Sequence, residues 1–119
     1  MLTIYHNPSC KKSREGLQFL RESGIEFAVV EYLKELFTEP ALEKLLVKLH
    51  KKPADLLRRQ EDYYKQHLKG KKFEDHELVR IMVENPKLIQ RPIVEGKYKA
   101  VVGDPVSEIE AVLDKPSRS

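Results

Sequence analysis

The sequence predicts an α/β protein in which helices flank a mixed, four-stranded sheet. Three observations favour this fold class. A short β-rich run, an amphipathic helix and a second β-rich run follow one another near the N-terminus, a helical block occupies the middle, and two β-rich runs joined by a glycine-containing turn lie near the C-terminus. The first pattern is typical of a βαβ unit with parallel strands, and the last is typical of a hairpin.

The first strand is expected over residues 2–5, which are apolar and partly β-branched, and a turn over Asn7-Pro8-Ser9 follows. From Cys10 the apolar residues recur with helical spacing until Gly24, which is placed to end the helix in the left-handed conformation. The β-rich run 25–32 is then the second strand. This order places Cys10 in the first helical turn after a strand.

The middle of the chain, about residues 39–85, is predicted to be helical. Thr38 is a suitable N-cap for its first helix, Pro53 begins a short second piece, and Phe73-Glu74-Asp75 opens a third, whereas 61–72 is predicted to be a helix-ending loop. An apolar stripe on the first helix has the spacing of a buried face: Leu42, Leu45, Leu46 and Leu49.

The C-terminal third is predicted to form a hairpin from strands over 88–94 and 97–102 around the turn Glu95-Gly96, then a helix opened by Asp104-Pro105. The tail, 115–119, is expected to fray. We therefore expect one domain over residues 1–119 with the thioredoxin-like plan, carrying the helical insertion of about 39–85 between strands two and three.

Cys10 is the only cysteine, and its position predicts a nucleophile. A thiol at a helix start meets unpaired backbone N–H groups and the positive end of the helix dipole, which favour the thiolate. Lys11, Lys12 and Arg14 add positive charge, and the Ser13 hydroxyl is placed to donate a hydrogen bond to the sulfur. The alternative is a small buried hydrophobic residue, the usual role of a lone cysteine.

Composition excludes several classes of protein. One cysteine permits no intrachain disulfide, no segment is apolar enough for a membrane span, and 34% of residues are charged, so we expect a cytoplasmic protein. The net charge of +3 does not indicate nucleic-acid binding. The four histidines show no paired spacing with one another or with Cys10, so no metal site is predicted.

Three stretches resemble the small glutaredoxin-coupled arsenate reductases and their relatives, which include Spx-type transcriptional regulators. They are 5–10 with the following Ser13-Arg14, 56–59 and 88–94, and the resemblance spans about residues 2–113. It implies a thioredoxin fold, one nucleophilic cysteine, arginines that bind an oxyanion, and a cis Arg91–Pro92 peptide bond.

The resemblance also implies roles for individual residues. Cys10 matches the nucleophile, and Arg58 and Arg91 match two oxyanion-binding arginines. His6 matches a histidine before the nucleophile; it is a candidate for catalysis, or a structural hydrogen-bonding residue. Arg58 has an alternative role as a surface cation and Arg91 as the partner of an acid. The expected substrate-binding or glutathione-binding set is Ser13, Arg14, Pro92 and Asp104.

One position departs from the arsenate reductases, which carry a third arginine after the fourth strand. This chain has Gly103-Asp104-Pro105 there, so we expect arsenate to be a poor substrate. Asp104 has two possible roles: it caps the last helix before Pro105, or its carboxylate binds the amino group of glutathione.

We expect an oxidoreductase that binds no cofactor and uses glutathione as co-substrate. Cys10 attacks a small oxyanion or an oxidised thiol, glutathione resolves the adduct, and glutaredoxin restores the thiol. The alternative is a non-catalytic Spx-like regulator that binds RNA polymerase. Those regulators usually carry Cys-x-x-Cys, whereas this chain has Ser13 at the second position, which disfavours an intramolecular disulfide switch.

Overall fold

The structure is a computed structural model that describes residues 2–113. Its internal contacts divide the chain into two compact units. The first contains the residues through Glu31 together with those from Arg91 onward, and the second is Tyr32–Gln90. The helical segment predicted from the sequence lies within the second unit.

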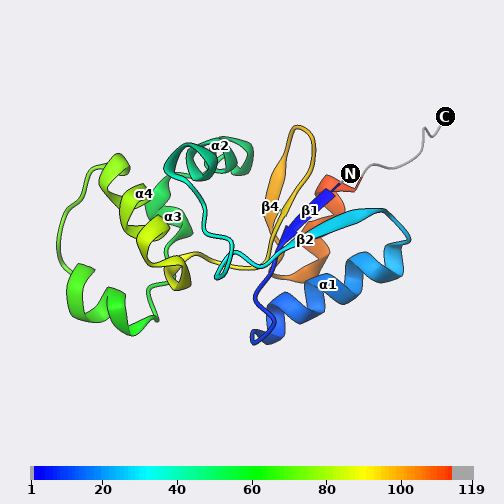
Figure 1. The fold of residues 1–119 in the computed structure, drawn as a ribbon, viewed down its shortest axis with the longest axis horizontal. Helices are drawn as coiled ribbons and strands as arrows, with labels where there is room; N and C mark the ends of the chain where they lie inside the picture. The colour runs from blue at the N-terminus through cyan, green and yellow to red at the C-terminus, as the bar shows by residue number, and fades with distance from the viewer. Residues whose placement is uncertain (1, 114–119) are drawn as a thin grey trace. The chain divides into compact units, whose positions relative to one another are not determined.

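The sheet of the first unit has the strand order β2-β1-β3-β4. β1 (Leu2–Tyr5) pairs in parallel with β2 (Phe27–Val30) and antiparallel with β3 (Ile93–Glu95), and β3 pairs antiparallel with β4 (Ala100–Val102) (Figure 1). This topology confirms the predicted βαβ unit, hairpin and mixed four-stranded sheet.

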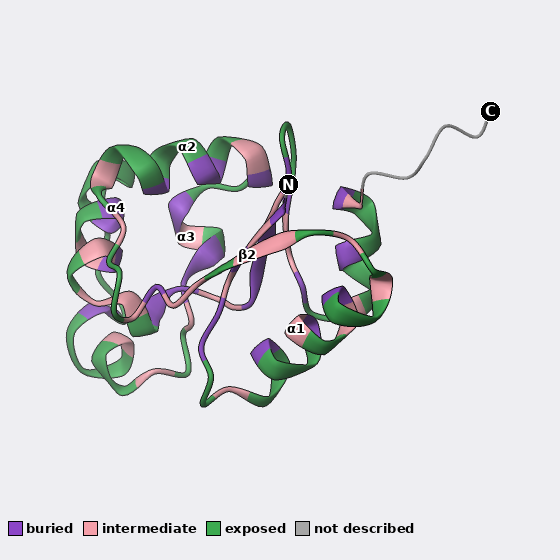
Figure 2. Cartoon of the chain, turned by 45° about the vertical axis from the view of Figure 1, so that its right-hand side comes forward, coloured by how far each residue is buried: buried purple, intermediate pink, exposed green. Residues whose placement is uncertain are grey.

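One face of this sheet packs against two helices, α1 (Lys11–Ser23) and the 3₁₀ helix η3 (Val106–Val112), which is orange to red in Figure 1. Alternation along β1 turns Leu2 and Ile4 to this face. Buried positions recur along α1, as Figure 2 shows, and Gly24 ends the helix with φ 74°, as predicted. The shared apolar core contains Leu2, Ile4, Leu20, Val94, Ile109 and Val112.

The C-terminal third differs from the sequence prediction in detail. The run expected as a strand from residue 88 begins with the end of the 3₁₀ helix η2 (Pro86–Leu88), and β3 starts only at Ile93. The hairpin turn lies two residues later than predicted: β3 extends through Glu95, and the Gly96 N–H donates to the Lys99 carbonyl at 2.7 Å, so the chain reverses at Lys97-Tyr98. The last helix is 3₁₀, and the tail expected to fray, 115–119, lies outside the described residues.

The second unit is helical, with α2 (Glu39–Leu49), α3 (Pro53–Leu56), η1 (Tyr64–Leu68), α4 (Asp75–Glu84) and η2. The Thr38 hydroxyl accepts a hydrogen bond from the Ala41 N–H, which confirms the predicted N-cap. The four leucines of the α2 stripe are buried, and α4 packs against both α2 and α3. The π-helix η1 replaces part of the loop expected over 61–72.

Candidate active site around Cys10

The turn between β1 and α1 presents the cysteine. Cys10 is the N-cap residue of α1, in extended conformation with φ −101° and ψ 125°, and its side chain is partly exposed. Asn7 organises this turn: its carbonyl accepts the Cys10 N–H at 3.0 Å, and its side-chain oxygen accepts the Ser9 N–H at 3.0 Å. The thiol therefore stands at the open N-terminus of a 13-residue helix.

The environment of the sulfur lowers the pKa of the Cys10 thiol below its ordinary value. Partial burial is the largest single influence and raises the pKa, because it disfavours the charged thiolate. A hydrogen bond from Arg91, the backbone N–H groups of Ser13 and Lys12, and the positive charge of Arg91 together outweigh it. The site therefore stabilises the thiolate, as expected of a nucleophile.

The cation that acts on the sulfur is not the one expected from neighbouring residues. Lys12 Nζ forms an ion pair with Asp104 Oδ2 at 2.6 Å, and Arg14 Nη1 donates to the Pro8 carbonyl at 3.0 Å. Neither side chain is among the main influences on the Cys10 pKa, and neither is Lys11. Arg91, 81 positions away in the sequence, supplies the charge instead.

Ser13 acts through its backbone. Its side chain is fully buried, and its hydroxyl oxygen accepts the Asn7 N–H at 2.9 Å. The expected hydrogen bond from this hydroxyl to the sulfur is replaced by one from the Ser13 backbone N–H. The side chain of Ser13 thus holds the turn closed while its main chain faces the thiolate.

His6 is buried, with 5% of its surface exposed, and its Nδ1 atom has no hydrogen-bond partner. The pKa of the imidazole is lowered, chiefly by burial. The charge of Glu31 and a hydrogen bond with the Ser13 backbone raise this pKa, and the charges of Arg21 and Arg14 lower it further. A neutral ring is therefore favoured, because protonation would place an unpaired N–H in a buried position. These features suit a structural role as well as a catalytic one.

The loop that carries Arg91 is packed tightly against α1. The Arg91–Pro92 bond is cis, as the resemblance implied, and the Pro92 carbonyl accepts the Gly103 N–H at 2.8 Å. A Cβ atom added to Gly16 would lie 2.9 Å from Pro92 Cγ, closer than such atoms normally approach. Gly16 therefore allows α1 to contact the Pro92 ring, next to the arginine that reaches the sulfur.

Asp104 does not cap the last helix, so that interpretation is wrong. The N-cap position of η3 is Pro105, which has no side-chain capping hydrogen bond. The Asp104 carboxylate instead pairs with Lys12, and the two side chains are 41% and 59% exposed. The acid at the position of the missing arginine is thus balanced by a lysine of the first turn of α1.

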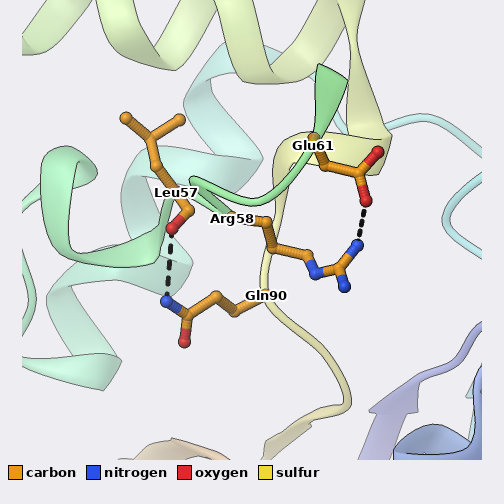
Figure 3. Close-up of polar contacts among 4 residues, drawn as sticks. All are labelled: Leu57, Arg58, Glu61 and Gln90. Atoms are coloured by element: carbon orange, nitrogen blue, oxygen red, sulfur yellow. Dashed lines mark hydrogen bonds and ion pairs between the residues drawn. The ribbon is translucent and has the colours of Figure 1, made fainter. Parts of the chain in front are cut away.

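Arg58 belongs to the second unit, where segment 55–58 is fastened to 88–90. The Arg58 N–H donates to the Leu88 carbonyl at 2.7 Å. The Gln90 side-chain amide donates to the Leu57 carbonyl at 3.3 Å, as Figure 3 shows. The Arg58 guanidinium contacts the carboxylate of Glu61. Sequence reasoning overlooked Gln90 and Glu61; the i, i+3 spacing of Arg58 and Glu61 was the available signal.

Among residues 2–113, no group of three or more His, Cys, Asp or Glu side chains is arranged to hold a metal ion. Within the same range, no helix has both the length and the apolar character that crossing a bilayer requires.

The site combines a thioredoxin-like sheet, one cysteine at a helix start, an arginine that donates a hydrogen bond to the sulfur, and an adjacent cis-proline. These features define a class of single-cysteine thiol proteins. The chain belongs to the ArsC family, whose model matches residues 5–112.

Similar proteins agree with this assignment. The uncharacterised protein YfgD of Escherichia coli K12 is 43% identical over 112 residues, which cover 92% of this chain and 94% of that protein. An arsenate reductase of Neisseria meningitidis serogroup B is 38% identical over 94% of this chain and 97% of its own length. The solved arsenate reductase of Vibrio cholerae is 36% identical, with a TM-score of 0.89 over 94% of this chain and 97% of that one.

Proposed function

We propose that this protein is a thiol-dependent oxidoreductase that reduces a small oxyanion such as arsenate through Cys10. The observation that carries the proposal is the stabilised thiolate, held by Arg91 and two backbone N–H groups at the start of α1. A guanidinium also binds a tetrahedral oxyanion through several N–H donors. Arg91 therefore serves the nucleophile and the substrate, and the family resemblance adds Arg58 as a second cation.

The proposed reaction uses two thiols. The Cys10 thiolate attacks arsenic(V), an S–As bond forms and one oxygen leaves as water. The thiolate of glutathione then attacks the Cys10 sulfur, the S–As bond breaks, and its electron pair reduces arsenic to arsenic(III), which leaves as arsenite. A glutaredoxin thiolate finally attacks the glutathione sulfur of the mixed disulfide and releases the Cys10 thiolate. Overall, arsenate and two thiols give arsenite, a disulfide and water.

The Lys12–Asp104 pair supports a finer proposal about substrates. The pair carries no net charge, so it does not replace the positive charge of a third arginine. Loss of one charge-assisted contact, about 1.5–3 kcal/mol, corresponds to about one to two powers of ten in rate. We infer that arsenate is a poor substrate. We also infer that the Asp104 carboxylate, which is 41% exposed, exchanges Lys12 for the ammonium group of glutathione during resolution.

Steady-state reduction of arsenate with glutathione and glutaredoxin tests this function. We expect slow turnover that depends on both thiol reagents and disappears in Cys10→Ser. A three-arginine arsenate reductase assayed beside it should be at least tenfold faster. Turnover that persists in Cys10→Ser, or no turnover of arsenate by the wild-type protein, would exclude the proposed reaction.

A further inference from the structure

The main chain of Arg58 is held firmly in its unit. Leu57 forms an antiparallel bridge with Ile89, and both residues are buried. The Arg58 N–H donates to Leu88, and the Gln90 N–H donates to the Leu56 carbonyl at 3.0 Å. The Gln90 side chain adds hydrogen bonds to the carbonyls of Asp55 and Leu57, each at 3.3 Å. The main-chain N–H of Arg58 is therefore paired within its unit, and its guanidinium is the group that can bind an anion.

That side chain already has an anion beside it. In Figure 3, the Arg58 guanidinium points at the carboxylate of Glu61, and its Nη1 atom contacts Oε2. The two side chains are only 18% and 25% exposed, so water screens the pair less than it screens a surface ion pair. The turn between them is closed by the Glu61 N–H, which donates to the Arg58 carbonyl at 3.2 Å. The pair is therefore both local and partly desolvated.

We propose that Glu61 is an internal counter-anion that sets the affinity of Arg58 for oxyanions. A carboxylate offers a guanidinium the same kind of oxygen acceptor as an arsenate or phosphate does. An incoming oxyanion that uses Arg58 has to displace Glu61 or share the guanidinium with it, and it meets a negative charge in either case. Glu61 thereby weakens oxyanion binding at Arg58. This inference rests on the proposed function, because the resemblance gives Arg58 its anion-binding role.

Glu61→Gln is the variant that separates this role from a positioning role. It keeps a hydrogen-bonding oxygen for Arg58 but removes the competing charge. A counter-anion predicts tighter oxyanion binding, by roughly fivefold to thirtyfold for a partly buried pair. A residue that only orients Arg58 predicts weaker binding, and a purely structural ion pair predicts no change.

The probe is inorganic sulfate, a tetrahedral dianion that a thiol does not reduce, titrated into the full-length protein while backbone amide NMR shifts are followed. The control is Asp62→Asn, which removes the same charge from the adjacent, exposed residue and should change the sulfate Kd by less than twofold. In an Arg58→Gln background, Glu61→Gln should give no gain. Thermal unfolding of every variant checks that each is folded.

The inference is overturned if Glu61→Gln leaves the sulfate Kd unchanged, weakens binding, matches Asp62→Asn, or keeps its gain without Arg58. It is also overturned if neither the wild type nor Glu61→Gln binds sulfate. Arsenate turnover by the wild type is measured in parallel. Turnover tests only the proposed function. Absence of arsenate turnover therefore contradicts the proposed function, whereas a failed sulfate result contradicts the role of Glu61.

Discussion

Removal of Arg91 is expected to raise the pKa of the Cys10 thiol. Arg91 contributes twice to lowering this pKa, through a hydrogen bond to the sulfur and through its charge. In Arg91→Ala, partial burial continues to raise the pKa, and only the N–H groups of Ser13 and Lys12 remain among the main influences that lower it. The balance should therefore shift towards the neutral thiol.

The size of the shift follows from the lost contact. A hydrogen bond to a charged group contributes about 1.5–3 kcal/mol, which is about one to two pKa units at 1.36 kcal/mol per unit. Cys10 is partly exposed, and water will replace part of the lost interaction, so we expect a rise of about one unit. At a pH well below both midpoints, the thiolate fraction of the variant should be about tenfold lower than that of the wild type. The alkylation rate should be only about threefold lower, because a more basic thiolate is more nucleophilic.

The assay is the pH dependence of alkylation by iodoacetamide. The wild-type midpoint should lie below the free-thiol value of about 8.5, and the Arg91→Ala midpoint about one unit higher. Arg91→Lys, which keeps the charge, should lie between them. Lys11→Ala removes an exposed cation adjacent to Cys10 in the sequence and should leave the midpoint within about 0.3 units. An unchanged midpoint in Arg91→Ala, or an equal shift in Lys11→Ala, would refute this account of the thiolate.

The lowered pKa of Cys10 also makes the free energy of unfolding depend on pH. The folded thiol has a lower pKa than the unfolded thiol, so the unfolded state binds more protons between the two values. The free energy of unfolding should gain a contribution as the pH rises from the folded pKa to about 8.5, and lose it as the pH falls back. Urea unfolding across this range, with Arg91→Ala as the comparison, should show a smaller contribution in the variant.

Three further substitutions test the surroundings of the site. Gly16→Ala should destabilise the protein by about 1–2 kcal/mol in urea unfolding, because the new methyl group meets Pro92. Helix propensity alone would stabilise the variant by about 1 kcal/mol. A stabilised variant would therefore show that the contact between α1 and Pro92 is not tight. Asp104→Asn should cost less than about 1 kcal/mol, since its ion pair with Lys12 is exposed, and should slow glutathionylation of Cys10 several-fold; an unchanged rate would remove Asp104 from the glutathione site. Gln90→Ala removes two hydrogen bonds to main-chain carbonyls and should cost about 1–2 kcal/mol; faster amide hydrogen exchange should be confined to 55–58, and exchange that is unchanged there would argue against a clamp.

The sequence by itself determined the features that depend on neighbouring residues. The helix start at Cys10, the Thr38 N-cap and the left-handed Gly24 were all predictable, because capping and turn chemistry act over a few residues. The hydrophobic periods also predicted the order of strands and helices, and with it the mixed sheet. The presence of a nucleophile candidate at a helix N-terminus followed from this local information.

Only the tertiary structure decided which charges act on that nucleophile. Sequence proximity favoured Lys11, Lys12 and Arg14, whereas the folded site uses Arg91, and Lys12 turns to Asp104, 92 positions away. The reason is that a short-range charge interaction depends on where side chains end in space. These groups are brought together by the strand pairing between β1 and β3 and by the packing of α1 against the loop after residue 90. The spacing of residues along the chain does not predict these contacts.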